Sequence, residues 1–117
     1  MNNIDTALEE LVLAMKADYD LMLATSEYTV SRDQLVVNIV KARNYAKVVV
    51  VTDGGYESTA GYESAAGFVA LKDNPKKGLL FGDLLKSSSW DAPATNFARG
   101  NLFQAGWQNC VRWVGIG

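Results

Sequence analysis

The sequence is most restricted in its histidine and cysteine content. It contains no histidine and one cysteine among its 117 residues. Histidine is the commonest general base and a common metal ligand, so its absence excludes a hydrolytic triad and removes the usual zinc ligand. One cysteine, Cys110, gives neither a disulfide framework nor a Cys-x-x-Cys metal motif. We expect no metal, no cofactor and no catalytic residue, and we expect Cys110 to be a small core residue in a reducing compartment.

Long apolar runs and a strong excess of charge are also missing. No apolar segment is long enough to span a bilayer, and acids stand near the N-terminus where a signal peptide carries basic residues. The net charge of −2 argues against the broad basic surface that polymeric nucleic acid requires. Residues 65–117 nevertheless hold six basic against three acidic side chains. We expect a cytosolic protein with no membrane or nucleic-acid partner, in which a local basic pocket is allowed.

The first half of the chain carries helical signals. With 49% hydrophobic residues, the chain should form a single domain over 1–117 around one core. Thr6-Ala7-Leu8-Glu9 has the form of a capping box, which predicts a helix running to about Ala24. Ser31 is a good N-cap and predicts a second helix, which ends near Arg43. The two expected apolar stripes are Ile4, Leu8, Leu11, Val12, Met15, Tyr19 and Met22, and then Leu35, Val36, Ile39 and Val40.

The pattern changes to strands after Tyr45. The β-branched run Val48–Thr52 predicts a central strand, and residues 66–72, 78–87 and 111–116 predict three more. The short connection between the second and third strands predicts an antiparallel hairpin. The expected fold is α+β, with two N-terminal helices packed on a mainly antiparallel four-stranded sheet and a long C-terminal ligand loop. The other face of the sheet would be solvated or an oligomer contact.

The expected ligand loop is the segment 86–101, which combines hydroxyl, amide, cationic and aromatic side chains. Pro93 and Gly100 interrupt regular structure there, and loops on a rigid scaffold commonly carry binding groups. Arg99 ranks first, because guanidinium offers a planar fork of donors to phosphate. Two simpler explanations remain open, namely that Arg99 bonds loop carbonyls and that the loop aromatics complete the core.

Other side chains offer the same chemistry. Lys86 is followed by three serines, the last of which is Ser89. This segment fits an anion-binding site and a polar strand end equally well. Trp90 and Phe97 lie among polar residues and are the rings we expect to stack on a base rather than fill the core. Arg112 lies on the last predicted strand.

Two segments carry a resemblance to a known family. Residues 82–94 read Gly-Asp-Leu-Leu-Lys-Ser-Ser-Ser-Trp-Asp-Ala-Pro-Ala, and Ala98-Arg99-Gly100-Asn101 follows. Together with residues 42–50, Ala-Arg-Asn-Tyr-Ala-Lys-Val-Val-Val, this pattern resembles the first type of phage Thoeris anti-defence proteins. Those proteins are sponges for cyclic ADP-ribose isomers made by bacterial TIR-domain enzymes.

The resemblance implies a function and a set of roles. The chain would sequester a cyclic ADP-ribose isomer uncleaved in the host bacterial cytoplasm, and so block activation of the Thoeris effector without being an enzyme. It would form a homo-oligomer with ligand sites at subunit contacts and a separate site for cyclic trinucleotides. Phosphate and ribose would be bound by Arg99, Asn96 and Asn101, adenine would stack on Trp90 or Phe97, and a neighbouring subunit would supply Arg112 and Arg43. The full expected ligand set is Arg99, Asn101, Asn96, Trp90, Phe97, Lys86, Ser89, Arg112 and Arg43.

Two other functions compete with this one. A small nucleotide-processing enzyme would need a carboxylate pair in one cleft, drawn from Asp53, Glu57, Glu63 and Asp83. A protein-binding phage inhibitor of a host factor would use the Gly-Tyr-Glu-Ser sequence, which occurs at 55–58 and again at 61–64, as an exposed acidic and aromatic surface.

Overall fold

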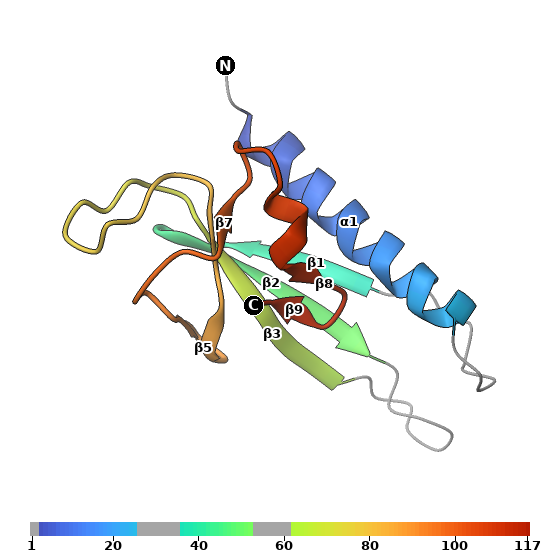
Figure 1. The fold of residues 1–117 in the computed structure, drawn as a ribbon. Helices are drawn as coiled ribbons and strands as arrows, with labels where there is room; N and C mark the ends of the chain where they lie inside the picture. Colours follow the sequence, from blue (N-terminus) through green and yellow to red (C-terminus); the bar gives the residue numbers. More distant parts are fainter. Residues whose placement is uncertain (1–2, 26–35, 53–61) are drawn as a thin grey trace.

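A computed structural model of the chain describes residues 3–25, 36–52 and 62–117 (Figure 1). One helix and a short 3-10 helix accompany a central sheet and two small hairpins. The elements in chain order are α1 Ile4–Thr25, β1 Val36–Lys41, β2 Tyr45–Thr52, β3 Tyr62–Ala70, β4 Asp83–Leu85, β5 Ser87–Ser89, β6 Ala92–Pro93, β7 Gly100–Asn101, η1 Trp107–Cys110, β8 Val111–Arg112 and β9 Gly115–Ile116.

Helix α1 confirms the first predicted helix but starts earlier than its capping box. Asn3 Oδ1 accepts a hydrogen bond from the backbone N–H of Asp5 at 3.0 Å, so Asn3 caps the helix and Thr6 lies within it. Leu11 and Met15 are fully buried, as the helical spacing predicts. In the described part of the chain, no helix has both the length and the hydropathy that crossing a bilayer requires.

The second predicted helix is wrong wherever the structure describes it. Val36–Lys41 forms β1, which pairs antiparallel with β2, and the Ser31 and Leu35 positions lie outside the described residues. Val37 and Ile39 pack against the core while Val36 and Val40 are exposed, which is the alternation of a strand. Consecutive β-branched residues favour this extended form, and their strand preference outweighs the weak helical spacing.

The sheet has five strands in the order β1-β2-β3-β4-β7, and all neighbours are antiparallel. The coarse α+β prediction and the antiparallel pairing of the second and third predicted strands are confirmed, whereas the four-strand count is wrong. The predicted strand 111–116 turns back on itself as the β8–β9 hairpin. The predicted loop 86–101 contains the β5–β6 hairpin and ends in β7, because its polar residues pair locally instead of staying irregular.

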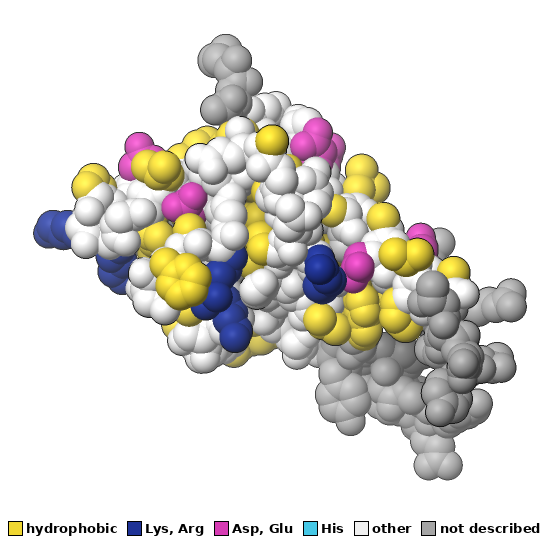
Figure 2. Space-filling model, in the orientation of Figure 1, with side chains coloured by type: hydrophobic (Ala, Val, Ile, Leu, Met, Phe, Trp, Pro, Cys, Tyr) yellow, Lys and Arg dark blue, Asp and Glu magenta, His cyan; other side chains and the backbone are white. Residues whose placement is uncertain are grey.

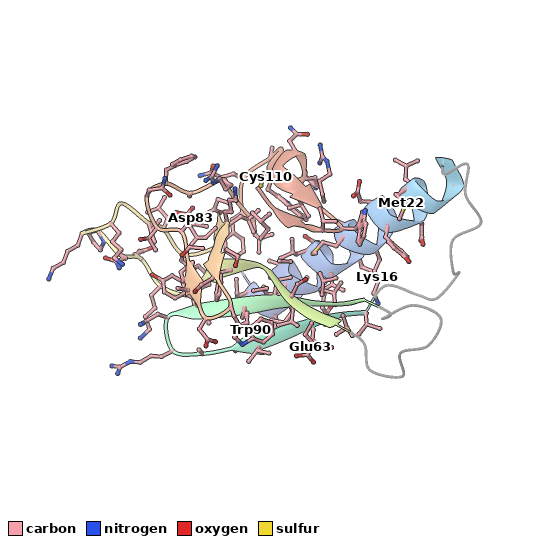
Figure 3. The ribbon with its side chains drawn as sticks, turned by 90° about the horizontal axis from the view of Figure 1, so that it is seen from below. Lys16, Met22, Glu63, Asp83, Trp90 and Cys110 are labelled. Carbon is pink, nitrogen blue, oxygen red and sulfur yellow. The ribbon has the colours of Figure 1, made fainter. Side chains whose placement is uncertain are left out.

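The β8–β9 hairpin lies on the same side of the sheet as α1, between α1 and β3 (Figures 1 and 3). Val111 and Ile116 enter the main core together with the helix residues. The backbone N–H of Trp113 donates to Asp18 Oδ2 at 2.9 Å, and the Trp113 ring meets Tyr19 edge to face. These contacts hold the turn of the hairpin against α1.

On the side of the hairpin that faces β3, the close packing requires glycine. A Cβ on Gly67 would lie 2.7 Å from Ile116 Cδ1 and 2.8 Å from the Leu85 carbonyl oxygen. Gly115 has a φ of 150°, and a Cβ there would lie 2.6 Å from the Ala66 oxygen. Both positions therefore allow β9 to approach β3 more closely than a side chain would permit.

The other face of the sheet carries a second, smaller cluster. Phe68 and Leu85 belong to it and alternate along their strands with Val69 and Leu84, which face α1. Leu79, from the turn after β3, is buried in the same cluster. This face was expected to be solvated or an oligomer contact, but the chain itself covers part of it.

Replacing Gly67 by Ala should destabilise the fold, because Ile116 and the Leu85 carbonyl occupy the space of the new methyl group. We expect the free energy of unfolding in urea to fall by about 1–3 kcal/mol. The exposed Ser64→Ala variant on the same strand should change it by less than about 0.5 kcal/mol. Equal stability of the two variants would contradict the close approach.

Candidate functional site

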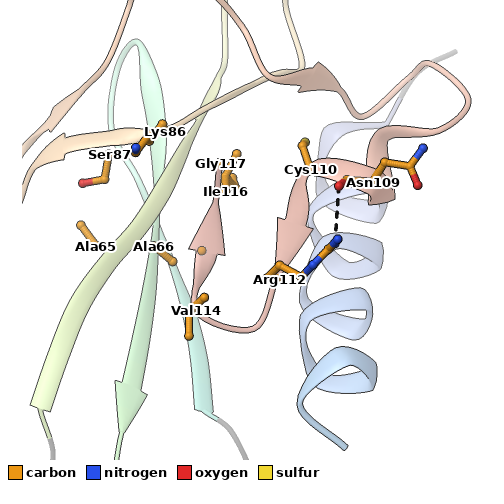
Figure 4. A pocket seen from close by; sticks show the side chains of 11 residues that line it. Ala65, Ala66, Lys86, Ser87, Asn109, Cys110, Arg112, Val114, Ile116 and Gly117 are labelled. Carbon is orange, nitrogen blue, oxygen red and sulfur yellow. Dashed lines mark hydrogen bonds between the residues drawn. The ribbon is translucent and has the colours of Figure 1, made fainter. Parts of the chain in front are cut away.

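A cleft of about 490 Å³ lies between β3 and the C-terminal hairpin (Figure 4). Ala65 and Ala66 of β3 line one side with Lys86 and Ser87, which lead into and begin β5. The other side is formed by residues of η1 and the hairpin. That size is within the range of pockets that hold small organic ligands. The residues of the second side are Asn109, Cys110, Arg112, Val114, Gly115, Ile116 and Gly117.

The cleft has a cation on each side. Lys86 is exposed at one wall and Arg112 at the other. Arg112 Nη1 donates to the Val111 carbonyl at 2.9 Å and to the Asn109 carbonyl at 3.4 Å (Figure 4). These bonds fix the direction of the guanidinium, and with partners among the described residues they use Nη1, so this five-donor group has further donors to offer a ligand. In Figure 2, basic atoms gather near β5 and over β8 on the same face of the molecule.

Arg99 adds a third cation close to the cleft. It lies near enough to Cys110, a lining residue, to lower the pKa of its thiol. Its guanidinium carbon is 4.0 Å from the centroid of the Phe97 ring. Its Nε is buried and has no hydrogen-bond partner among the described residues. A buried donor without an acceptor is costly, so the position of this guanidinium carries an unfavourable term.

The Cys110 thiol is held in its neutral form. Burial raises its pKa, and this effect outweighs its backbone hydrogen bond and the nearby Arg112 and Arg99 charges, which lower it. Its Sγ donates to the Trp107 carbonyl at 3.2 Å. Cys110 was predicted to be a buried core residue; it is half-buried, packs against the core with one side and lines the cleft with the other.

Asn101 has a structural position within the fold. It is buried in β7, and its Nδ2 donates to Asp83 Oδ1 at 2.9 Å and to the Phe81 carbonyl at 3.0 Å. Its Oδ1 accepts from the Phe103 N–H at 2.8 Å. Both amide hydrogens therefore have acceptors inside the protein, and the side chain joins β4 and β7 instead of facing the cleft.

The two aromatic residues chosen for stacking are both on the surface. Trp90 is 44% exposed and Phe97 is 53% exposed. Lys47 lies 4.1 Å from the centroid of the Trp90 ring and pairs with Asp91 at 2.7 Å. The Phe97 ring instead contacts the guanidinium of Arg99, the arginine beside the cleft. Neither ring is among the residues that line the cleft.

The structure thus brings together part of the predicted set. Lys86 and Arg112 line the cleft and Arg99 lies beside it, whereas the exposed Ser89 and Asn96 do not line it. Arg43 was expected at a helix-to-strand junction but lies in the turn between β1 and β2, away from the cleft lining. Ser87, which lines the cleft, belongs to the serine run that the sequence suggested for an anion, whereas sequence reasoning missed Asn109 and Cys110 as lining residues. Asn109 and Cys110 shortly precede Arg112, so closeness to that cation was the available signal.

Among the described residues that line the cleft, no side chain is a carboxylate. Asp83 is buried and accepts from the Leu80 N–H, Glu63 is exposed on β3, and Asp53 and Glu57 lie outside the described residues. The first Gly-Tyr-Glu-Ser copy also lies outside them. In the same ranges, no three potential metal-ligating side chains of the His, Cys, Asp or Glu type come together.

Comparisons with protein-family models, curated proteins and solved structures give no match to this chain.

Asn101→Ala should lower stability, because it leaves the Asp83 carboxylate and the Phe81 and Phe103 backbone groups without their partner. We expect a loss of about 1–3 kcal/mol in the free energy of unfolding. The matched variant Asn96→Ala, at an exposed position, should change it by less than about 0.5 kcal/mol. An Asn101→Ala protein as stable as Asn96→Ala would show that the amide has no structural role.

The pH dependence of Cys110 alkylation should reflect the raised pKa of its thiol. We expect the iodoacetamide rate of the folded protein to reach half its maximum at a higher pH than that of the same chain unfolded in urea, because burial disfavours the thiolate. The pH of half-maximal rate is compared, since burial also slows access at every pH. A lower midpoint in the folded protein would mean that the arginines dominate over burial.

Proposed function

We propose that this chain binds a small phosphorylated nucleotide, a cyclic ADP-ribose isomer, in the cleft and holds it without cleaving it. In a phage-infected bacterium this sequestration would block activation of the Thoeris effector. The observation that carries the proposal is the pair of cations, Lys86 and Arg112, on opposite walls of a cleft of about 490 Å³. A cleft without carboxylate side chains among its described lining residues favours an anion over a cation.

The pyrophosphate of the ligand fits the charge arrangement best. Its two phosphates each carry a negative charge, and the two charged side chains among the described lining residues, Lys86 and Arg112, are both cations. Arg99, whose charge acts on the Cys110 thiol, adds a third positive charge beside the cleft. Each charge-assisted hydrogen bond contributes about 1.5–3 kcal/mol, so two or three of them offset much of the cost of association.

The sugar and base would use neutral groups. Ser87 and Asn109 line the cleft and offer a hydroxyl and an amide for ribose. For adenine stacking, Phe97 is favoured over Trp90, because its ring already contacts Arg99 whereas Trp90 contacts Lys47. Phe97 and Arg99 would then bind base and phosphate as one unit.

Binding without chemistry agrees with the side chains present. A cleaving enzyme needs an acid, a base or an activated nucleophile. The nucleophile types that line the cleft include the neutral Cys110 thiol and the Ser87 hydroxyl, which donates to the Ser89 carbonyl, and no acidic side chain lines the described part of the cleft. We therefore expect the protein to release the ligand in its uncleaved form. The proposal also includes a homo-oligomer whose ligand sites lie at subunit contacts. Arg43 would contribute to such a site only from a neighbouring subunit. Cyclic trinucleotides would bind at a separate site.

The binding test uses the purified protein with a cyclic ADP-ribose isomer. Free ligand is removed by filtration, the protein is heat-denatured, and the released material is chromatographed. We expect depletion followed by release of the intact ligand. A new product peak would indicate an enzyme, and no depletion would favour the alternative of a protein partner.

Variants of the two wall cations should locate the site. Lys86→Ala and Arg112→Ala should each weaken binding about ten- to a hundredfold, which corresponds to one charge-assisted contact. Lys76→Ala, in an exposed turn outside the cleft, is the matched control and should bind like the unmodified protein. Ligand should also protect Cys110 from alkylation, and binding without such protection would place the ligand elsewhere.

A further inference from the structure

Strand β1 forms one end of the central sheet, and its outer edge has no strand partner among the described residues. In the parts of the chain that the structure describes, its one strand partner is β2. Its six residues, Val-Val-Asn-Ile-Val-Lys, include no proline, and the one charged side chain stands at its end. Edges of this kind pair readily with another strand unless charge, proline or a bulge protects them.

The turn after β1 shows which backbone groups of β1 point away from β2. The Ala42 N–H donates to the Tyr45 carbonyl at 2.9 Å, so these two residues face each other as a hydrogen-bonding pair. Hydrogen-bonding residues alternate along an antiparallel strand. Val36, Asn38 and Val40 therefore direct their backbone groups to β2, and Val37, Ile39 and Lys41 direct theirs outward.

From this edge we infer that a second copy of the chain pairs with β1, antiparallel and related by a two-fold axis through Asn38. This inference goes beyond the proposed nucleotide binding and does not depend on it. In this register Val37 lies opposite the partner's Ile39, and both have outward-facing backbone groups. Each copy donates and accepts equivalent bonds, as a two-fold interface requires.

The side chains match in this register. Val36 and Val40, which are 46% and 53% exposed, lie opposite each other across the interface, and Asn38 lies opposite the partner's Asn38. Moving the axis to Ile39 would instead place Val37 opposite the partner's Lys41 and Asn38 opposite the partner's Val40. Apolar pairs and a central amide pair stabilise a sheet better than these mixed pairs, so the first register is favoured.

A groove beside the same edge supports a second copy as the partner. The groove lies between α1 and β1 and has a volume of about 870 Å³. Leu8, Val12, Leu13 and Ile39 give it an apolar lining, and Leu13 is 65% exposed. Directly opposed residues of paired strands point to the same face, so the two-fold axis keeps both α1 helices on one face of the joined sheet. Each groove then opens toward the partner's helix, which covers apolar surface that is otherwise in water.

Two double variants at the same positions test the pairing by charge. Val36→Lys with Val40→Lys places lysine opposite lysine twice, whereas Val36→Glu with Val40→Lys places glutamate opposite lysine twice. By light scattering, we expect the unmodified protein to have a molar mass of twice 12.7 kDa, or another even multiple of 12.7 kDa. The Lys/Lys variant should have half that mass or less, and the Glu/Lys variant should keep the full mass. A monomeric unmodified protein, or equal masses of the two variants, would overturn the inference.

A cysteine at the axis tests the register even if a charged variant fails to fold. In a Cys110→Ser background, Asn38→Cys should form a disulfide-linked dimer under mild oxidation, because opposed Cβ atoms in a sheet are about 4.5–5.5 Å apart. Val36→Cys is the matched control and should remain uncross-linked, since its counterpart lies several residues further along the partner's strand. Equal cross-linking of both variants, or of neither, would rule out the axis at Asn38.

Discussion

The close approach of the C-terminal hairpin to β3 is the constraint on which the rest of this structure depends. Without a side chain at Gly67, Ile116 packs directly against the sheet, and the hairpin fits between β3 and α1. On its other side, Asp18 and Tyr19 of α1 hold Trp113. The hairpin is thus fixed from both sides, and its position determines the fold and also where Arg112 stands.

The cleft follows from that placement. The β8–β9 hairpin covers the α1 side of β3 but leaves space beside residues 86–87, where the chain leaves the central sheet after β4. Lys86 and Arg112 are 26 positions apart in sequence, yet they line one cavity because their two hairpins flank the same strand. The described residues that line the cleft include no acidic side chain, so the charges of Lys86 and Arg112 add there. This summed positive field is the physical basis for proposing an anionic ligand.

Sequence patterns predicted those features that depend on local chemistry. The apolar spacing of α1, the β-branched run in β2 and the antiparallel pairing of β3 with β4 are confirmed, since each reflects nearby residues. Val36–Lys41 was misassigned because its apolar positions fit both periods, and pairing with β2 decided the outcome. The choice between a ligand role and a structural role for Asn101 depended on Asp83, 18 residues away, which no local pattern reveals.

The site was predictable to the same extent. A cation next to serines marked Lys86, and an arginine on a predicted strand marked Arg112, so residue chemistry alone selected two lining residues. Asn109 and Cys110 were not selected as lining residues, because a polar residue and a small thiol in an apolar run carry no signal until the hairpin is placed. The orphaned Arg99 Nε is likewise a property of packing. It separates Arg99 from the solvent-exposed Arg43 by an observation that the sequence does not contain.

The two surfaces proposed here are on different sides of the hairpin, and this limits how an assembly is built. The outer edge and its groove belong to β1 and α1, whereas the cleft lies beyond β8 and β9, against β3 and β5 (Figures 1 and 4). A dimer formed through β1 therefore leaves both clefts open to ligand. For a neighbouring subunit to reach the cleft, a second kind of contact is needed, and two different contacts on each chain produce assemblies larger than a dimer. Ligand dependence of assembly beyond the dimer would then report on the cleft, while the dimer itself would persist without ligand.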